Sequence, residues 1–283
     1  MIPSPLVSTE WLAAHLGEAN LRVADASWYL PAAKRDPRAE YAATHIPGAV
    51  FFDLDAISDQ TTNLPHMMPD PAAFASSMKK LGLGDGDLVV FYDGAGVYSA
   101  PRAVWMMRAM GHAKAAVLDG GFPKWRREGR PTDAEPPSIP RRHFIPRANA
   151  SLVRDFSAMN ANLDTRAEQV LDARSGPRFR GEEVEPRPGV QPGHIPGSIN
   201  VAYSEVVAAD GTMKKPEELR RIFESRGVDL KKPIVTSCGS GVTAAILTLA
   251  LDIAGSGSHA LYDGSWSEWG ARADARIETG GTA

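Results

Sequence analysis

The chain repeats itself at a period as long as a whole domain. His45-Ile-Pro-Gly recurs as His194-Ile-Pro-Gly 149 residues later, and Asp25-Ala recurs as Asp172-Ala after 147 residues. Leu118-Asp-Gly-Gly-Phe likewise matches Tyr262-Asp-Gly-Ser-Trp. Solenoid repeats have periods of about 20–50 residues. The duplication therefore predicts two copies of one domain, each of ordinary domain size, within the 283 residues.

A change in composition marks the boundary between the two copies. Residues 130–150 hold five prolines and show little periodic apolar pattern, which is typical of a semi-rigid connector. We therefore expect a first domain over residues 1–130, a proline-rich linker over 131–150 and a second domain over 151–283.

Short apolar runs alternate with longer helical patterns in each half. Residues 88–92 and 233–237 read as strands, and residues 99–110, 216–225 and 242–254 read as helices. Ser99 is expected to cap the first of these helices, and Gly111 and Gly255 are expected just past two of their ends. The alternation predicts the α/β class, with each domain a parallel sheet covered by helices on both faces.

Charge and apolar pattern disfavour several kinds of partner. The net charge is −3 with acids and bases interspersed, which argues against nucleic acid. The most apolar helical stretch, residues 242–254, is shorter than a membrane span and contains Asp252. The N-terminus lacks a basic region followed by an apolar core, and the single cysteine excludes an intramolecular disulfide. We expect a cytoplasmic protein with no nucleic-acid or membrane partner.

The duplication provides an internal control for separating fold from chemistry. Features present in both halves are candidates for the fold, and features in one half alone are candidates for function. His45 and His194 each precede Ile-Pro-Gly, and Asp-Gly turns occur at Asp119 and Asp263. These residues are therefore predicted to be structural.

The two strand-to-helix turns differ at one telling position. Cys238-Gly-Ser-Gly follows one predicted strand, and Asp93-Gly-Ala-Gly follows its counterpart 145 residues earlier. A carboxylate cannot perform the chemistry of a thiol, so the first half is predicted to be a non-catalytic partner domain.

The setting of Cys238 favours a reactive thiolate. In open α/β sheets ligands bind beyond the carboxyl ends of strands. Gly239 and Gly241 allow backbone N–H groups to converge there, and a helix N-terminus adds to the stabilisation of negative charge. A lone cysteine is more often buried and inert, which is the alternative. A cysteine phosphatase would need an arginine six residues on, where this chain has Ala244.

With these features the chain resembles the two-domain rhodanese family of sulfurtransferases over nearly its whole length. The resemblance implies tandem rhodanese-like domains. Within the family, the loop is similar to that of the 3-mercaptopyruvate sulfurtransferases, because Gly239 and Ser240 stand where thiosulfate-specific members carry basic residues. The resemblance places the loop residues Gly239, Gly241, Val242 and Thr243 against the substrate.

The resemblance also implies further site residues. Arg178 and Arg187 match the arginines that bind the substrate carboxylate, with Arg180 as a third candidate, and Tyr98 matches a tyrosine near the site. On the residues alone, a solvated loop neutralised by Glu182, Glu183 and Glu185 is the alternative. Ser240, His66 and Asp55 match the residues expected around Cys238, which implies a site in the cleft between the halves. His66 has no counterpart in the repeat, which favours a functional role.

The implied activity is a ping-pong sulfur transfer. Cys238 takes the sulfur of 3-mercaptopyruvate as a persulfide, releases pyruvate, and passes the sulfur to a thiol, thioredoxin or cyanide. No metal or organic cofactor is expected. Two alternatives stay open, a thiosulfate:cyanide sulfurtransferase and a non-catalytic persulfide or redox-sensing module that docks a protein partner.

Overall fold

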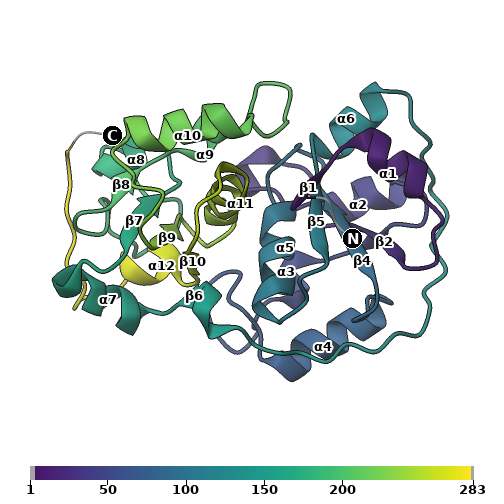
Figure 1. The fold of residues 1–283 in the computed structure, drawn as a ribbon. Coiled ribbons are helices and arrows are strands. Elements are labelled where there is room, and N and C mark those ends of the chain that lie inside the picture. The colour runs from purple at the N-terminus through teal and green to yellow at the C-terminus, as the bar shows by residue number, and fades with distance from the viewer. Residues whose placement is uncertain (1–3, 282–283) are drawn as a thin grey trace. The chain divides into compact units, whose positions relative to one another are not determined.

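The computed structural model describes residues 4–281, which fall into two compact units (Figure 1). The first unit contains the chain up to Gln60, Met68–Asn149 and Ala208–Met213. The second contains Thr61–Met67, Ala150–Val207 and the chain from Lys214 onward. Each unit therefore includes one short segment that the linear order of the sequence assigns to the other half.

The first unit holds five strands and six α-helices among its described residues. The strands are β1 (Leu6–Val7), β2 (Leu21–Asp25), β3 (Val50–Phe51), β4 (Leu88–Tyr92) and β5 (Ala115–Leu118). The helices are α1 (Thr9–His15), α2 (Pro37–Ala43), α3 (Leu54–Ile57), α4 (Pro71–Lys80), α5 (Ala100–Ala109) and α6 (Gly121–Arg127), with a 3₁₀ turn, η1, at Pro31–Ala33.

The second unit repeats this plan. Its strands are β6 (Val153–Arg154), β7 (Gln169–Asp172), β8 (Ile199–Asn200), β9 (Ile234–Ser237) and β10 (His259–Tyr262). Its helices are α7 (Phe156–Thr165), α8 (Gly176–Arg180), α9 (Tyr203–Val206), α10 (Pro216–Ser225), α11 (Ala244–Ala254) and α12 (Ser265–Trp269), with a 3₁₀ turn, η2, at Ala150–Leu152.

Both sheets are fully parallel and share one strand permutation. The orders are β1-β5-β4-β2-β3 and β6-β10-β9-β7-β8, so each strand of one sheet has a counterpart at the same place in the other. This confirms the predicted fold class and the origin of the sequence repeat in a duplicated domain.

Helices cover both faces of each sheet. In the first unit, Leu12 of α1 and Trp125 of α6 pack with Val90 and Tyr92 on one face of β4. On the other face, α5 lies against β4 and β5. In the second unit, α7 and α12 take one face and the apolar α11 packs against β9 and β10 on the other. The strands are thus buried on both sides, which explains their continuous apolar runs.

Most predicted elements lie where the sequence placed them, with one correction. Helix α10 spans the predicted residues, and Gly255 ends α11 with a φ of 83°. Ser99 does precede α5, but its hydroxyl donates to the carbonyl of Ala26 and does not cap the helix. The Asp93 carboxylate accepts the N–H groups of Ser99 and Ala100 in its place.

The two repeated histidines are structural, as predicted. His45 Nδ1 hydrogen-bonds to the carbonyl of Tyr41, and the two rings stack with centroids 4.4 Å apart. His194 Nδ1 bonds to the carbonyl of Phe179 and stacks on that ring at 3.8 Å. In the described part of the chain, no helix is both long and apolar enough to cross a lipid bilayer.

Candidate active site

Cys238 lies at the carboxyl end of β9, the middle strand of the second sheet. Its side chain is buried, with 1% exposed. The chain then makes a tight loop to α11, in which Gly241 adopts a φ of 80°. That conformation is one glycine tolerates readily, and it turns the Gly241 N–H onto Cys238 Sγ at 3.1 Å.

Helix α12 fixes the first turn of this loop. The N–H of Trp266 donates to the Cys238 carbonyl and the N–H of Ser267 donates to the Gly239 carbonyl, both at 2.9 Å. Ser265 Oγ accepts the N–H of Cys238 at 3.2 Å. In a trans peptide the C=O and the next N–H point in opposite directions. The N–H groups of Gly239 and Ser240 are therefore turned away from α12.

In the first unit, the backbone of the equivalent loop donates hydrogen bonds to a carboxylate. Asp93 follows β4, the counterpart of β9, and its buried carboxylate accepts four backbone N–H groups, from residues 95, 98, 99 and 100. Burial raises the pKa of Asp93, and these hydrogen bonds act in the opposite direction. The loop is thus a cradle for a negatively charged group. Its counterparts 145 residues later are the N–H groups of residues 240, 243, 244 and 245.

His66 and Ser240 meet within the second unit. His66 Nδ1 lies 3.0 Å from Ser240 Oγ, and both side chains are buried. His66 belongs to the segment Thr61–Met67 and has a φ of 59°, which is uncommon for a residue other than glycine. The structure therefore brings together two of the residues named from the sequence, although 174 positions separate them.

Arg178 lies beside the cysteine loop. A Cβ atom placed on Gly239 would lie 3.3 Å from Arg178 Nη2, so the guanidinium rests against the bare backbone of this glycine. Glu185 accepts hydrogen bonds from Nε and Nη2 of the arginine. The carboxylate thereby fixes the orientation of Arg178 and leaves its Nη1 edge for a further acceptor.

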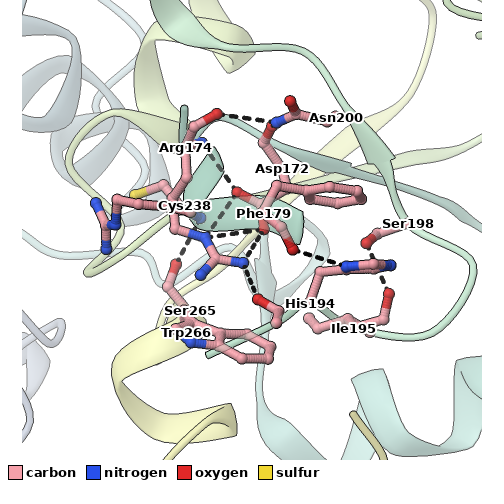
Figure 2. Close-up of polar contacts among 12 residues, drawn as sticks. Asp172, Arg174, Phe179, His194, Ile195, Ser198, Asn200, Cys238, Ser265 and Trp266 are labelled. Atoms are coloured by element: carbon pink, nitrogen blue, oxygen red, sulfur yellow. Dashed lines mark hydrogen bonds and ion pairs between the residues drawn. The ribbon is translucent and has the colours of Figure 1, made fainter. Parts of the chain in front are cut away.

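Arg174, which sequence reasoning did not single out, is the buried centre of this region. Its guanidinium makes a two-point contact with Asp172 and donates to Glu185 and to the carbonyl of Gly193. Figure 2 shows it between Asp172 and the Trp266 ring, whose centroid is 4.4 Å away. Burial alone would lower the pKa of Arg174, and the two carboxylates raise it above its ordinary value. The repeat could have indicated a role for Arg174, because its counterpart in the first half is Ser27 and the arginine is therefore present in one half alone.

The remaining predicted residues lie in several places. Arg180 is held by the exposed Glu182 at 2.7 Å, so the neutralised-loop alternative describes this arginine. Arg187 is half-buried in the loop between α8 and β8. Val242 is buried and Thr243 directly precedes α11.

Two predicted site residues lie in the first unit. Asp55 accepts a hydrogen bond from Trp28 Nε1, and Tyr98 donates its N–H to Asp93.

Comparison with known proteins adds the family. A model described as the rhodanese-like domain matches residues 8–128 and 155–272. A 3-mercaptopyruvate sulfurtransferase from Rattus norvegicus is 44% identical over 95% of this chain and 92% of the relative. A thiosulfate sulfurtransferase from the same organism is 41% identical over 97% of this chain and 95% of its own. The crystal structure of SseA from Escherichia coli, described among 3-mercaptopyruvate sulfotransferases, matches with a TM-score of 0.85 at 39% identity, covering 93% of this chain and 99% of that one.

Proposed function

The chain belongs to the rhodanese family, and on that premise we propose that it is a 3-mercaptopyruvate sulfurtransferase that carries sulfur as a persulfide on Cys238. The observation that carries the proposal is the pairing of the Cys238 loop with the Asp93 loop of the first unit. Each loop joins a strand to a helix through the same turn, and they differ in the side chain that follows the strand, which is Asp93 in one and Cys238 in the other.

A persulfide places its charged atom at the same number of bonds from Cα as an aspartate does. Asp93 extends three atoms from its Cα to a charged oxygen, and a Cys238 persulfide would extend three atoms to a charged sulfur. The N–H groups that bind the Asp93 carboxylate have sequence counterparts in the Cys238 loop, where the N–H of Gly241 donates to Cys238 Sγ and that of Ala245 donates to the Val242 carbonyl. The second loop therefore suits a terminal persulfide sulfur, stabilised by backbone donors and the N-terminus of α11. Burial of Cys238 shields that sulfur from water.

The charge distribution beside the loop favours mercaptopyruvate as the donor. Thiosulfate carries two charges close to the transferred sulfur and would benefit from cations next to the nucleophile. The adjoining residues here are Gly239 and Ser240, and the cation in contact with the loop is Arg178. Because Glu185 engages Nε and Nη2, the Nη1 edge of Arg178 is the part that would bind the substrate carboxylate. Arg187 is proposed as the second arginine of this clamp.

The proposed reaction balances without an external oxidant. The Cys238 thiolate attacks the sulfur of 3-mercaptopyruvate, an S–S bond forms, and the C–S bond breaks with its electron pair on carbon. The resulting enolate takes a proton and leaves as pyruvate. We propose that Ser240 donates this proton and is reprotonated through His66, and their hydrogen bond supports this role. An acceptor thiolate or cyanide then attacks the outer sulfur and restores the Cys238 thiolate.

Asp55 and Tyr98 complete the proposal. Both belong to the first unit. We propose that Asp55 supports the His66–Ser240 pair electrostatically and that Tyr98 contacts the substrate. The physiological acceptor is proposed to be a small thiol or thioredoxin, and the compartment to be the cytoplasm.

Mass spectrometry of the intact protein after 3-mercaptopyruvate alone tests the first half-reaction. We expect a gain of one sulfur in the wild type, none in Cys238→Ser, and release of one pyruvate per chain. Initial rates with thiosulfate and mercaptopyruvate then separate the two donors, and a clear preference for thiosulfate would overturn the substrate assignment. One sulfur bound and one pyruvate released per chain, with no further pyruvate when a thiol acceptor is added, would favour the non-catalytic persulfide module.

A further inference from the structure

A cavity in the first unit corresponds to the place that Arg174 fills in the second. Arg174 and Ser27 occupy the same position of the repeat, two residues after Asp172 and Asp25. In both units the first carboxylate oxygen of the aspartate accepts the N–H of that residue at 2.9 Å. The two carboxylates are therefore held in the same way by the backbone. The guanidinium on Asp172 has no equivalent from Ser27, whose side chain ends at a hydroxyl.

The remaining partners of Arg174 also have counterparts in the first unit. In the second unit the guanidinium contacts Asp172, Glu185, the Gly193 carbonyl and the Trp266 ring. The repeat offsets match Asp172, Gly193 and Trp266 with Asp25, Thr44 and Phe122, and Glu40 corresponds to Glu185 by its ion pair with a neighbouring arginine. All four of these first-unit residues line one cavity of about 720 Å³. The volume lies within the range of small-molecule sites.

The neighbouring arginine keeps its place in both units. Arg35 donates to Glu40 and to the carbonyl of Gly94, as Arg178 pairs with Glu185 beside Gly239. Arg35 also lies over the Tyr29 ring, with its guanidinium carbon 3.8 Å from the centroid. Arg35 thus reproduces the position of Arg178 and does not replace Arg174.

We propose that the cavity of the first unit binds a small molecule that carries a guanidinium group at one end and a carboxylate at the other. The guanidinium of the ligand lies against the buried Asp25 and the face of Phe122, in the position that corresponds to the Arg174 guanidinium of the second unit. Planar cations bind a carboxylate through two parallel hydrogen bonds and stack on aromatic rings, as Arg174 itself does. The exposed Arg126 and Arg127 also line the cavity, and they favour an anionic tail over a second cation.

The raised pKa of Asp25 indicates a carboxyl whose ionised form would be stabilised by a bound cation. The carboxyl is 4% exposed, and burial raises its pKa to about 6. Hydrogen bonds from Ser27 and Tyr92 act against this rise, and the charge of Asp93 adds to it. A guanidinium beside Asp25 would stabilise the ionised form, as Arg174 does for Asp172.

Calorimetric titration of the full-length protein with 4-guanidinobutyrate tests the proposal. We expect saturable binding to the wild type and affinity at least about tenfold weaker for Asp25→Asn, which loses the charge opposite the guanidinium. Ser27→Arg places a guanidinium in the cavity from within, so we expect it to abolish binding. Ser76→Arg adds the same charge on the exposed face of α4 and should bind as the wild type does.

Butyrate and 4-aminobutyrate serve as matched probes. The first lacks the cation and the second lacks the planar fork, so both should bind more weakly than 4-guanidinobutyrate. Absence of saturable binding to the wild type at millimolar concentrations would overturn the proposal, as would equal binding to Ser27→Arg when thermal unfolding shows that variant to be folded. None of these measurements depends on sulfur transfer, so this proposal and the proposed function fail separately.

Discussion

At the scale of single residues, one carboxylate, that of Glu185, fixes the two arginines near Cys238. Glu185 is buried and accepts hydrogen bonds from both Arg174 and Arg178. Arg174 also has Asp172, whereas Glu185 is the carboxylate bound to Arg178 in the described structure. Glu185 therefore orients Arg178, the proposed substrate arginine, and also neutralises the charge of the buried Arg174.

Replacement of Glu185 by Gln should separate substrate binding from chemistry. The amide keeps one acceptor but removes the charge, so Arg178 is less firmly oriented and Arg174 loses one of its two counterions. We expect KM for 3-mercaptopyruvate to rise about tenfold with a smaller change in kcat, and the free energy of unfolding to fall by about 1–3 kcal/mol. Steady-state kinetics and urea unfolding measure the two effects. Replacement of the exposed Glu182, which pairs with Arg180, by Gln is the control and should change neither.

The two repeat-related aspartates should respond in opposite ways to the same substitution. Asp25 has a folded-state pKa of about 6 against an ordinary value of 3.8. A raised carboxyl pKa means that its contribution to stability is greatest below pH 3.8 and is lost as the pH rises through about 6. Asp25→Asn should therefore stabilise the protein at pH 7, by up to about 3 kcal/mol, with the gain vanishing toward pH 4.

Asp172→Asn is the matched comparison. It leaves the buried Arg174 with one carboxylate fewer, so it should destabilise the protein by about 3–5 kcal/mol at pH 7. Urea unfolding of both variants at several pH values checks the pair. A loss of stability at pH 7 in Asp25→Asn would contradict the role given to its burial.

At the scale of elements, the glycine beside Cys238 determines how close Arg178 can come to the loop. Gly239 lacks a positive φ, so alanine is compatible with the backbone there, but its Cβ would press on Arg178 Nη2. We expect Gly239→Ala to raise KM for 3-mercaptopyruvate about three- to tenfold while the folded state is retained, because the end of a flexible side chain must move. Gly86→Ala, with no atoms near the added Cβ, is the control. An unchanged KM would remove Arg178 from the substrate site.

The elements were largely predictable from sequence, and the contacts between them were not. Apolar runs and proline starts placed β4, β9 and α10, because strands buried on both faces and helix first turns leave local patterns. The link from Arg174 to Glu185 joins two residues 11 positions apart, across the short helix α8 and the irregular segment after it, which carry no periodic signal. Buried arginines are rare, so composition gave no reason to expect this one. The meeting of His66 with Ser240 came from the family resemblance alone.

At the scale of the whole molecule, duplication left two similar loops, and the second one contains Cys238, the proposed nucleophile. Ser240 corresponds to Ala95 and Arg174 corresponds to Ser27, so the first unit differs in more than its Asp93. Each unit also includes a segment from the other half of the chain, and the segment in the second unit supplies His66. The proposed chemistry thus draws on a set of residues that the first unit holds only in part.

Moving the cysteine should therefore not move the activity. In the double variant Cys238→Ser/Asp93→Cys the thiol follows β4 in a loop of the same shape, but Ala95 has no hydroxyl to deliver a proton. Because catalytic groups that act together contribute in a strongly non-additive way, we expect pyruvate release to stay at the level of Cys238→Ser. The single variant Asp93→Cys should gain one sulfur per chain by mass spectrometry, on Cys238. Thermal unfolding of both variants checks that they are folded. A second sulfur on residue 93 would mean that the backbone cradle alone suffices for the transfer, and that Ser240 and His66 act only on later steps.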